Sequence, residues 1–382
     1  MASFFAPCPR GLEALLEGEL QRLDVQAIMR SEGGVAFEGA MELALMANLE
    51  SRFASRILWR VGGGRYRDER DVNAVARAID WPAIFTVDRT LRVDVAATRS
   101  KLTSLAFAAL TIKDAIVDRF RAESGRRPSV DKRAPDVRVH AHSTTDEVTI
   151  YVDTSGEPLF KRGYRRDTED APLRENLAAG LVALSDWKPG TAFLDPLCGS
   201  GTIAIEAALM AADRAPGLNR TFGFQKLVWY DGPVWQRIRQ RAVDRARPAP
   251  SAPSIFASDT SPRAIALATS NAQRAKVGEW ITFERADVLT RQAPSPSGTL
   301  VANPPYGVRV SDTERLDVFY PKLGDALKTH FAGWHAWLLT GDPALAKAIR
   351  LKPARRIPLY NGAIECRFVS FPLVAGSHRK TQ

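Results

Sequence analysis

The sequence has few of the residues and runs that mark secreted, metal-binding and membrane proteins. Its three cysteines, Cys8, Cys198 and Cys366, are odd in number and far apart, so they predict neither a disulfide framework nor a pair of metal ligands. The five histidines are scattered. No run of about eighteen apolar residues exists to span a membrane, and residues 1–11 contain two prolines, unlike a signal peptide. These absences predict a cytoplasmic protein without a metal site.

Composition and charge are those of a folded chain with a basic surface. The hydrophobic fraction of 45% and the charged fraction of 25% exclude a chain that is disordered throughout. With 382 residues, the chain is long enough for two or three domains. The net charge of +10 favours a polyanionic partner.

Patterns in the first 166 residues predict two small α+β units. Over residues 11–23, leucines recur on one helical face, and a strand-like stretch follows around residues 35–37. The Gly62-Gly63-Gly64 run predicts a hinge. Beyond it, a long amphipathic helix over residues 102–124 lies between alternating, strand-like stretches. We therefore place domain boundaries near residues 61 and 166.

Basic residues concentrate around the predicted helix over residues 102–124. From Arg99 to Arg133 there are nine basic and four acidic residues, whereas residues 1–61 are slightly acidic. Such an excess is typical of a solvated helix face or of an electrostatic footprint for RNA phosphates. On the second interpretation, the candidate RNA-binding residues are Arg99, Lys101, Arg119, Arg126, Arg127, Lys132, Arg133, Lys161 and Arg162.

Residues 167–382 alternate strand and helix patterns, which predicts a mostly parallel sheet with helices on both faces. The expected strands are 192–195, 254–259, 281–287, 299–303, 336–340, 356–360 and 364–371. Asn361-Gly362 is typical of a tight hairpin, so the last two strands should be antiparallel neighbours. Residues 213–253 should loop out as an insertion. The fold class is therefore α/β: a seven-stranded, Rossmann-like domain preceded by two α+β units.

The strongest motif joins the first of these strands to a helix that starts near Thr202. Its glycines, Gly199 and Gly201, would let the backbone approach a ligand. The motif is neither G-x-G-x-x-G nor a phosphate loop with lysine. Asp195 before the glycines would repel a pyrophosphate but suits an ammonium group, such as that of S-adenosylmethionine; a structural turn is the alternative. The cofactor candidates here are Asp195, Pro196, Cys198, Gly199, Ser200, Gly201 and Thr202.

Two further aspartates follow at the ends of the next two predicted strands. Asp259 occupies the position at which a carboxylate accepts hydrogen bonds from both ribose hydroxyls. Asp287 could accept a hydrogen bond from an adenine amino group. Each could instead be a simple helix cap. With their neighbours Thr260 and Val288, they complete the cofactor candidates that spacing indicates.

The fourth predicted strand ends in Asn303-Pro304-Pro305-Tyr306. The prolines stop the strand and stiffen the backbone, because they lack an N–H and fix φ. The Asn303 side chain and the Pro304 carbonyl could then accept the two hydrogens of an exocyclic amine, while Tyr306 stacks on the heterocycle that carries it. A stiff turn is the alternative for these four residues alone. The glycine motif and the ordered aspartates favour an amine-binding site, with all four residues as catalytic candidates.

Together these motifs resemble those of class I S-adenosylmethionine-dependent methyltransferases, and residues 303–306 resemble their amino-methylating motif. Across nearly its whole length, the chain resembles the N-terminal half of the bifunctional bacterial 23S rRNA guanine-N2 methyltransferases. It also resembles the THUMP-domain tRNA guanine-N2 methyltransferases. The stretches that carry the resemblance are residues 6–13, 113–118, 128–131, 134–139, 161–165, 172–175, 195–202 and 360–366.

The resemblance implies a ferredoxin-like segment over residues 1–61, a THUMP RNA-binding domain over 62–166 and a class I methyltransferase domain over 167–382. It places residues 172–176 beside the methionine end of the cofactor, which adds Arg174 and Glu175 to the candidates. The implied reaction is methylation of guanosine N2 in structured RNA, 23S rRNA or alternatively tRNA. The second methyltransferase of the bifunctional relatives is not part of this sequence.

Two other functions stay open. Adenine-N6 DNA methyltransferases and protein-glutamine methyltransferases use the same four-residue motif, although the RNA-binding N-terminal half argues against both. A catalytically silent RNA-binding or ribosome-assembly factor is a rival of another class. The intact motif from Asp195 to Thr202 argues against it.

Overall fold

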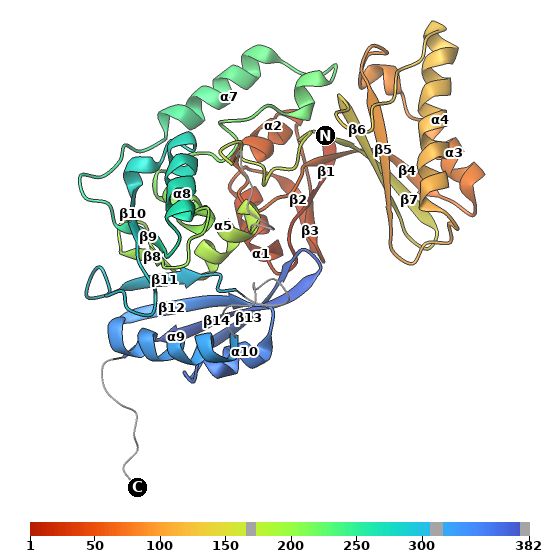
Figure 1. The fold of residues 1–382 in the computed structure, drawn as a ribbon. Helices are drawn as coiled ribbons and strands as arrows, with labels where there is room; N and C mark the ends of the chain where they lie inside the picture. The colour runs from red at the N-terminus through yellow and green to blue at the C-terminus, as the bar shows by residue number, and fades with distance from the viewer. Residues whose placement is uncertain (166–172, 306–315, 375–382) are drawn as a thin grey trace. The chain divides into compact units, whose positions relative to one another are not determined.

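The computed structural model describes residues 1–165, 173–305 and 316–374 (Figure 1). The chain folds into two compact units. Unit 1 consists of Met1–Cys8, Leu16–Leu159 and Arg220–Arg241, and unit 2 consists of Pro9–Leu15, Phe160–Asn219 and Ala242–Gln382. Tyr306, one of the predicted catalytic residues, lies outside the described residues.

Unit 1 is organised around a seven-stranded sheet with the order β2-β3-β1-β4-β7-β6-β5. Only the β5–β6 pair is parallel among these neighbours. The patterns in the sequence indicate neither β1 nor β2; β2 is exposed along most of its length and shows no apolar alternation. The strands are β1 (Ala2–Pro7), β2 (Gln26–Ser31), β3 (Gly34–Gly39), β4 (Leu58–Arg65), β5 (Leu91–Ala97), β6 (Val137–Ser143) and β7 (Glu147–Asp153).

The helices of unit 1 include α2 (Met41–Glu50), α3 (Glu69–Arg77) and α4 (Leu105–Ser124), while α1 (Glu13–Gln21) begins in a segment of unit 2. α3 and α4 lie on one face of strands β4 to β7 (Figure 1). The helix predicted over residues 102–124 is confirmed with a later start, because the Ser104 hydroxyl accepts a hydrogen bond from the Phe107 N–H at 3.2 Å. No helix in the described part of the chain is long and apolar enough to cross a membrane.

The Gly62-Gly63-Gly64 run is part of β4, so the predicted hinge is wrong. The run pairs with β7, and the ladder shifts register just before Gly62. A Cβ on Gly62 would lie 2.7 Å from Ile79 Cδ1, and a Cβ on Gly63 would lie 2.9 Å from the Val148 carbonyl oxygen. The glycines therefore allow close approach of neighbouring groups to the strand.

The predicted insertion does not simply loop out, because Arg220–Arg241 folds as part of unit 1. The Phe224 N–H donates to the Thr154 carbonyl at 2.8 Å, and the Val228 N–H donates to the Ile84 carbonyl at 2.9 Å. Phe224 is fully buried and packs edge-on against Trp235 of α7 (Gly232–Asp244). These buried aromatic rings fix the segment in unit 1.

Unit 2 is organised around a second seven-stranded sheet, with the order β10-β9-β8-β11-β12-β14-β13. All seven predicted strands are present, with ends shifted by up to two residues. The last two form the predicted antiparallel hairpin across Asn361 and Ile364. The strands are β8 (Phe193–Asp195), β9 (Ile255–Asp259), β10 (Ile281–Arg285), β11 (Gly298–Ala302), β12 (Trp334–Thr340), β13 (Arg355–Asn361) and β14 (Ile364–Pro372).

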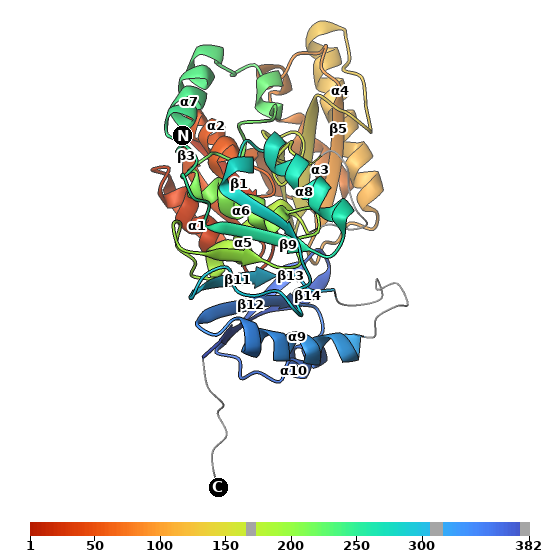
Figure 2. The ribbon, with the colours of Figure 1, turned by 60° about the vertical axis from the view of Figure 1, so that its left-hand side comes forward.

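Helices cover both faces of this sheet (Figures 1 and 2). One face carries α5 (Glu175–Leu184), α6 (Thr202–Ala211) and α8 (Pro262–Arg274), and the other carries α9 (Leu316–His330) and α10 (Pro343–Ala348). The core under α9 and α10 includes Leu300, Tyr320, Phe331, Trp334 and Val369, all almost fully buried. This three-layer arrangement leaves the strand ends as the place for a ligand.

We expect Gly62→Ala to lower the free energy of unfolding by about 1–3 kcal/mol, because the added methyl overlaps Ile79 in the core. Gly18→Ala in α1, where nothing lies within 4 Å of the added Cβ, is the control and should not destabilise the protein. Chemical denaturation of both variants measures the difference. If Gly62 were instead part of a flexible hinge, Gly62→Ala would change the free energy of unfolding as little as Gly18→Ala does.

Candidate active site

The sheet order of unit 2 brings four predicted site residues to one edge. β10, β9, β8 and β11 are parallel neighbours, so their carboxyl ends meet there. Asp195 ends β8 and Asp259 ends β9, while Asp287 and Asn303 follow the ends of β10 and β11. Open α/β sheets bind their ligands at this edge.

The glycine motif forms a tight turn between β8 and α6. The Gly199 N–H donates to Asp259 Oδ2 at 3.0 Å, and Asn271 Nδ2 donates to the Ser200 carbonyl at 3.0 Å, so both β9 and α8 hold the loop. Cys198 and Ser200 are buried, and Thr202 begins α6 as predicted. The loop is thus fixed by the protein itself.

Gly201 has a packing role that the sequence did not indicate. Its φ is +83°, and a Cβ there would lie 2.9 Å from the Ala268 Cβ of α8. Glycine at this position is therefore required for the packing of α6 against α8. Gly199 also has a positive φ, +50°, and its N–H bond to Asp259 shapes the turn.

The Asp195 carboxyl is the most unusual group at this edge. It is 0% exposed, and neither of its oxygens makes a hydrogen bond of good geometry with a described residue, although the backbone N–H groups of Leu197 and Ala204 lie near enough to lower its pKa. Burial raises the pKa of Asp195 to about 8, and the nearby Asp259 carboxylate acts in the same direction. A cation placed beside Asp195 would favour its charged form. The position therefore suits an ammonium group and disfavours a phosphate.

The remaining cofactor candidates near the strand ends differ in what they can offer. Asp259 already accepts from the Gly199 and Ser261 N–H groups, at 3.0 and 2.9 Å, and keeps free lone pairs. Asp287 and Thr260 are exposed, whereas the Val288 side chain lies in the core. Only the backbone of Val288 could therefore face a ligand.

A buried ion-pair network that the sequence did not reveal supports the loop from the α5 side. Arg165 donates to Thr202 Oγ1 at 2.6 Å and lies 3.6 Å from the carboxylate of Glu175, the first residue of α5. Arg162 pairs with Glu206 of α6 at 3.5 Å, and the Tyr164 hydroxyl donates to the same carboxylate at 3.4 Å. The cation-rich run at residues 161–165 was the only sequence signal. Thr202 and Glu206, which bind this run, lie about forty residues further along the chain, and only Glu175 is near it in sequence.

This network changes the interpretation of Arg174, Glu175 and Arg162. Arg174 is exposed and its guanidinium lies over the Phe160 ring at 5.0 Å, whereas Glu175 is buried against Arg165. Arg162 is 2% exposed and faces Glu206, so it is not accessible to RNA. We remove Arg162 from the predicted RNA-binding residues. Lys161, beside it, is exposed.

Asn303 leaves β11 with its side-chain oxygen buried. Asn303 Oδ1 has no hydrogen-bond partner among the residues that the structure describes. Pro304 is buried, and the carbonyl of the exposed Pro305 accepts from the Tyr320 hydroxyl at 3.1 Å. The predicted position of Tyr306 cannot be compared, because that residue lies outside the described part. Asn303 Oδ1 is thus available to accept a hydrogen bond from a ligand.

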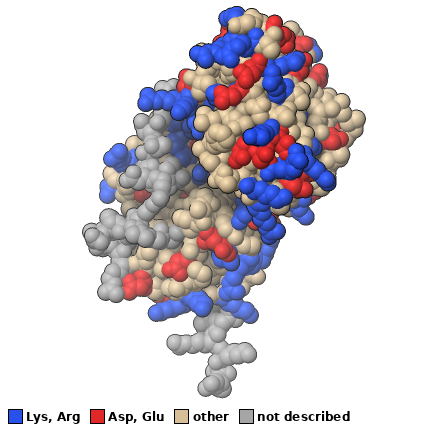
Figure 3. All heavy atoms as spheres, turned by 90° about the vertical axis from the view of Figure 1, so that its right-hand side faces the viewer, with Lys and Arg blue, Asp and Glu red and all other residues tan. Residues whose placement is uncertain are grey.

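The predicted basic surface of unit 1 divides into paired and unpaired cations. Arg119 pairs with Asp80 and Glu123, at 3.2 and 3.4 Å, and Arg126 pairs with Asp88 at 2.5 Å. Figure 3, which views the side of α3 and α4, shows acidic side chains among the basic ones. The exposed side chains without an ion-pair partner in the described ranges are Arg99, Lys101, Arg127, Lys132 and Arg133.

The unpaired cations form two groups at opposite ends of β5. Arg99 and Lys101 follow its last residue, while Arg127, Lys132 and Arg133 flank Ser129, whose carbonyl accepts from the Leu91 N–H at the start of the strand. β5 has seven residues, so the groups lie roughly 20 Å apart. Among the described residues, no cluster of three or more His, Cys, Asp or Glu side chains could hold a metal ion.

The sheet with its final antiparallel hairpin, the glycine turn after β8 and the polar strand ends define a Rossmann-like methyltransferase fold. The chain belongs to the family of RMKL-like methyltransferase domains, whose model matches residues 162–370. Residues 66–153 match the THUMP domain, and residues 3–58 match the RlmL ferredoxin-like domain.

Similar proteins extend over the whole chain. The ribosomal RNA large subunit methyltransferase K/L of Syntrophotalea carbinolica is 40% identical over 380 residues, which are 97% of this chain and 53% of that protein. The chain therefore spans about half the length of the curated relatives it matches. SMU.472, assigned as a methyltransferase and crystallised with SAH, has a TM-score of 0.86 at 29% identity, with 98% of this chain and 99% of that chain covered.

A second solved structure carries a different description. It is a protein from Listeria monocytogenes described as a predicted N6-adenine-specific DNA methylase. It has a TM-score of 0.86 at 32% identity, and the match covers 97% of this chain and 96% of that chain.

We expect the stability of the ligand-free protein to depend on pH through Asp195. An unfolded Asp has a pKa of roughly 3.9, so between about pH 4 and pH 8 the unfolded chain releases this proton while the folded chain, with its pKa of about 8, retains it. The carboxyl therefore costs the folded state free energy that grows through this window, on the order of 5 kcal/mol in total. Asp195→Asn should lose this slope, measured by denaturation at each pH.

The control for this experiment is Asp325→Asn, which changes a mostly exposed aspartate of α9. It should keep the pH profile of the wild type. If Asp195→Asn also kept that profile, Asp195 would be ionised in the ligand-free protein at neutral pH.

Proposed function

We propose that this chain transfers a methyl group from S-adenosylmethionine to the exocyclic N2 amine of a guanosine in 23S ribosomal RNA. The buried, unpartnered Asn303 Oδ1 at the carboxyl edge of the sheet carries the proposal, because it offers an acceptor to an N–H group of a substrate. The family of the domain, the THUMP domain and the name of the Syntrophotalea relative support the reaction and the RNA substrate.

The residues at the strand ends fit S-adenosylmethionine. The Asp195 carboxyl, buried without an opposite charge among the described residues, would take the ammonium group of the methionine part. Asp259 has lone pairs for the ribose hydroxyls, and Asp287 is exposed where it could accept from the adenine amino group. Arg165 and Glu175 would hold the loop and the start of α5 around the methionine end. When bound, the cofactor supplies a methyl group that its sulfonium makes electrophilic.

The protein contributes mainly position to this reaction. Asn303 Oδ1 and the Pro304 carbonyl would accept the two amine hydrogens and direct the nitrogen lone pair toward the methyl group. Tyr306 would stack on the guanine after the base has left its helix. Cys198 takes no part as a nucleophile and serves as a small buried residue of the loop. No general base is needed before the amine attacks, and the methylated nitrogen would lose its extra proton to water after the transfer.

The proposed organisation follows the three parts of the chain. A ferredoxin-like segment over residues 1–61 and a THUMP domain over 62–166 would recruit the RNA in the cytoplasm, and residues 167–382 would carry the reaction. The proposed RNA contacts are the exposed cations Arg99, Lys101, Arg119, Arg126, Arg127, Lys132, Arg133 and Lys161. Among them, the unpaired ones should contribute most, because an existing ion pair already offsets the charge.

Methylation of DNA adenine N6 is the second candidate, favoured by the description of the Listeria structure. A methyl-acceptor assay on RNA, DNA and protein fractions separates the candidates. Incorporation into 23S rRNA, mapped by mass spectrometry to guanosine N2, supports the proposal. Incorporation into tRNA would change the substrate, incorporation into DNA alone would establish the second candidate, and no binding of S-adenosylmethionine would leave an RNA-binding factor.

We expect Asn303→Ala to reduce methyl transfer by about 100-fold or more, because the amine is then no longer oriented toward the methyl group. Labelled methyl donor and an rRNA acceptor measure the rate. Calorimetric binding of S-adenosylmethionine is the control and should change less than about threefold, since Asn303 contacts the amine and not the cofactor. Activity within a few-fold of the wild type would exclude Asn303 from the mechanism.

We expect the triple substitution of Arg127, Lys132 and Arg133 by Gln to weaken RNA binding and its salt dependence. Three lost phosphate contacts would reduce the slope of log K against log salt by up to roughly 2.7. The comparison variant replaces Arg119, Arg121 and Arg126, which are ion-paired, by Gln, and it should reduce the slope less than the first variant does. Filter binding across a salt series compares the two variants. Equal slopes for the first variant and the wild type would contradict the proposal that these three residues contact RNA phosphates.

A further inference from the structure

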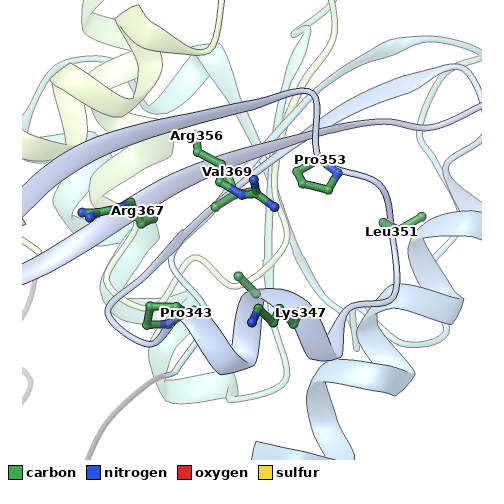
Figure 4. A pocket seen from close by; sticks show the side chains of 8 residues that line it. Pro343, Lys347, Leu351, Pro353, Arg356, Arg367 and Val369 are labelled. Carbon is green, nitrogen blue, oxygen red and sulfur yellow. The ribbon is translucent and has the colours of Figure 1, made fainter.

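A pocket of about 490 Å³ lies in unit 2 between α10 and the β13–β14 hairpin (Figure 4). α10 contributes Lys347, while β13 and β14 contribute Arg356 and Arg367. The apolar part of the lining includes Leu351 and Val369. Small-molecule sites commonly measure roughly 300–1,000 Å³ and combine apolar walls with a few polar groups.

The cations of this pocket have little opposing charge nearby. Lys347 and Arg356 are exposed and have no ion-pair or side-chain hydrogen-bond partner among the described residues. Arg367 pairs with Glu365 at 2.6 Å, but both side chains are partly exposed, so the pair is weak. Arg350 and Lys352, on the turn between α10 and β13, are also exposed and add to the positive potential. The pocket differs in this respect from the ion-paired cations around α4.

The pocket lies toward the same edge of the sheet as Asn303. Thr340 of β12 pairs with Arg367 of β14, and Leu338 of the same strand pairs with Ala302, the residue before Asn303. Arg367 is therefore two strands from β11, or roughly 10 Å across the sheet. If a base of an RNA is bound at Asn303, the phosphates of the neighbouring nucleotides can reach as far as Arg367.

We propose that this pocket binds a nucleotide that flanks the target guanosine in the substrate RNA. Lys347 and Arg356 contact the phosphate of this nucleotide. The planar guanidinium of Arg367 can stack on its base, and the wall of the pocket that contains Leu351 packs against its sugar or base. The inference rests on the proposed function, because it requires an RNA to be bound at Asn303. It adds a contact made by the methyltransferase domain itself, separate from the basic residues of the THUMP domain.

The test compares two double variants that each remove two positive charges from unit 2. Lys347→Gln/Arg356→Gln changes the pocket. Lys188→Gln/Lys276→Gln changes two exposed lysines, one before β8 and one after α8, at the opposite edge of the sheet. For each variant, steady-state methylation of an rRNA fragment is measured across a salt series, together with the KM for S-adenosylmethionine.

The pocket variant should raise the KM for RNA about tenfold. The slope of log KM for RNA against log salt should fall by up to roughly 1.8, because two phosphate contacts are lost. The KM for S-adenosylmethionine should stay within twofold of the wild type. The control variant should change each quantity less than twofold. If the two variants behave alike while the wild type methylates RNA, the pocket proposal alone is overturned. If the wild type methylates no RNA, the proposed function fails and this inference fails with it.

Discussion

The buried Asp195 carboxyl imposes the main physical constraint on the methyltransferase unit. It lies at the end of the three-residue strand β8 without a hydrogen bond of good geometry or an opposite charge from any described residue, where an ionised carboxylate would cost several kcal/mol. The ligand-free protein avoids most of that cost by keeping the proton, since the pKa rises to about 8. A ligand that brings a positive charge provides the missing partner. The buried Asp195 carboxyl therefore lowers the stability of the ligand-free protein at the position that is best suited to bind a positively charged ligand.

The other buried charges of this unit are arranged differently. Arg162 with Glu206, and Arg165 with Glu175 and Thr202, have partners inside the protein and join the starts of α5 and α6 to the segment before them. Breaking such a pair leaves an uncompensated buried charge, which costs more than the pair contributes. These residues hold the walls of the site, while Asp195 and Asn303 keep their oxygens unpartnered among the described residues. The supporting charges thus face a charge of opposite sign inside the protein, whereas neither Asp195 nor Asn303 has one within the described ranges.

The sequence predicted much of unit 2 because its signals are local. Apolar runs ending in Asp or Asn mark strand ends, and a parallel sheet must bring such ends to one edge. The Asn361-Gly362 turn likewise specifies the hairpin without help from the rest of the chain. The resemblance to a known family supplied what spacing could not, namely the possible role of Arg174 and Glu175.

What sequence reasoning missed depends on partners far along the chain. A count of charges cannot show that Arg126 faces Asp88 or that Arg162 is buried against Glu206. The glycines at 62–64 look like a hinge until β7 and Ile79 are placed beside them. In the same way, Gly201 is explained by Ala268, which follows it by more than sixty residues.

The exchange of segments between the two units affects the order in which the protein can fold. Unit 1 contains Arg220–Arg241, and unit 2 contains Pro9–Leu15 from near the N-terminus. During synthesis, the buried ring of Phe224 joins unit 1 only after all of α5 and α6 has been made. The first unit therefore cannot be completed before the second is well under way. A cut at the predicted boundary near residue 166 would separate Arg220–Arg241 from the rest of unit 1 and Pro9–Leu15 from the rest of unit 2, so neither unit would be complete.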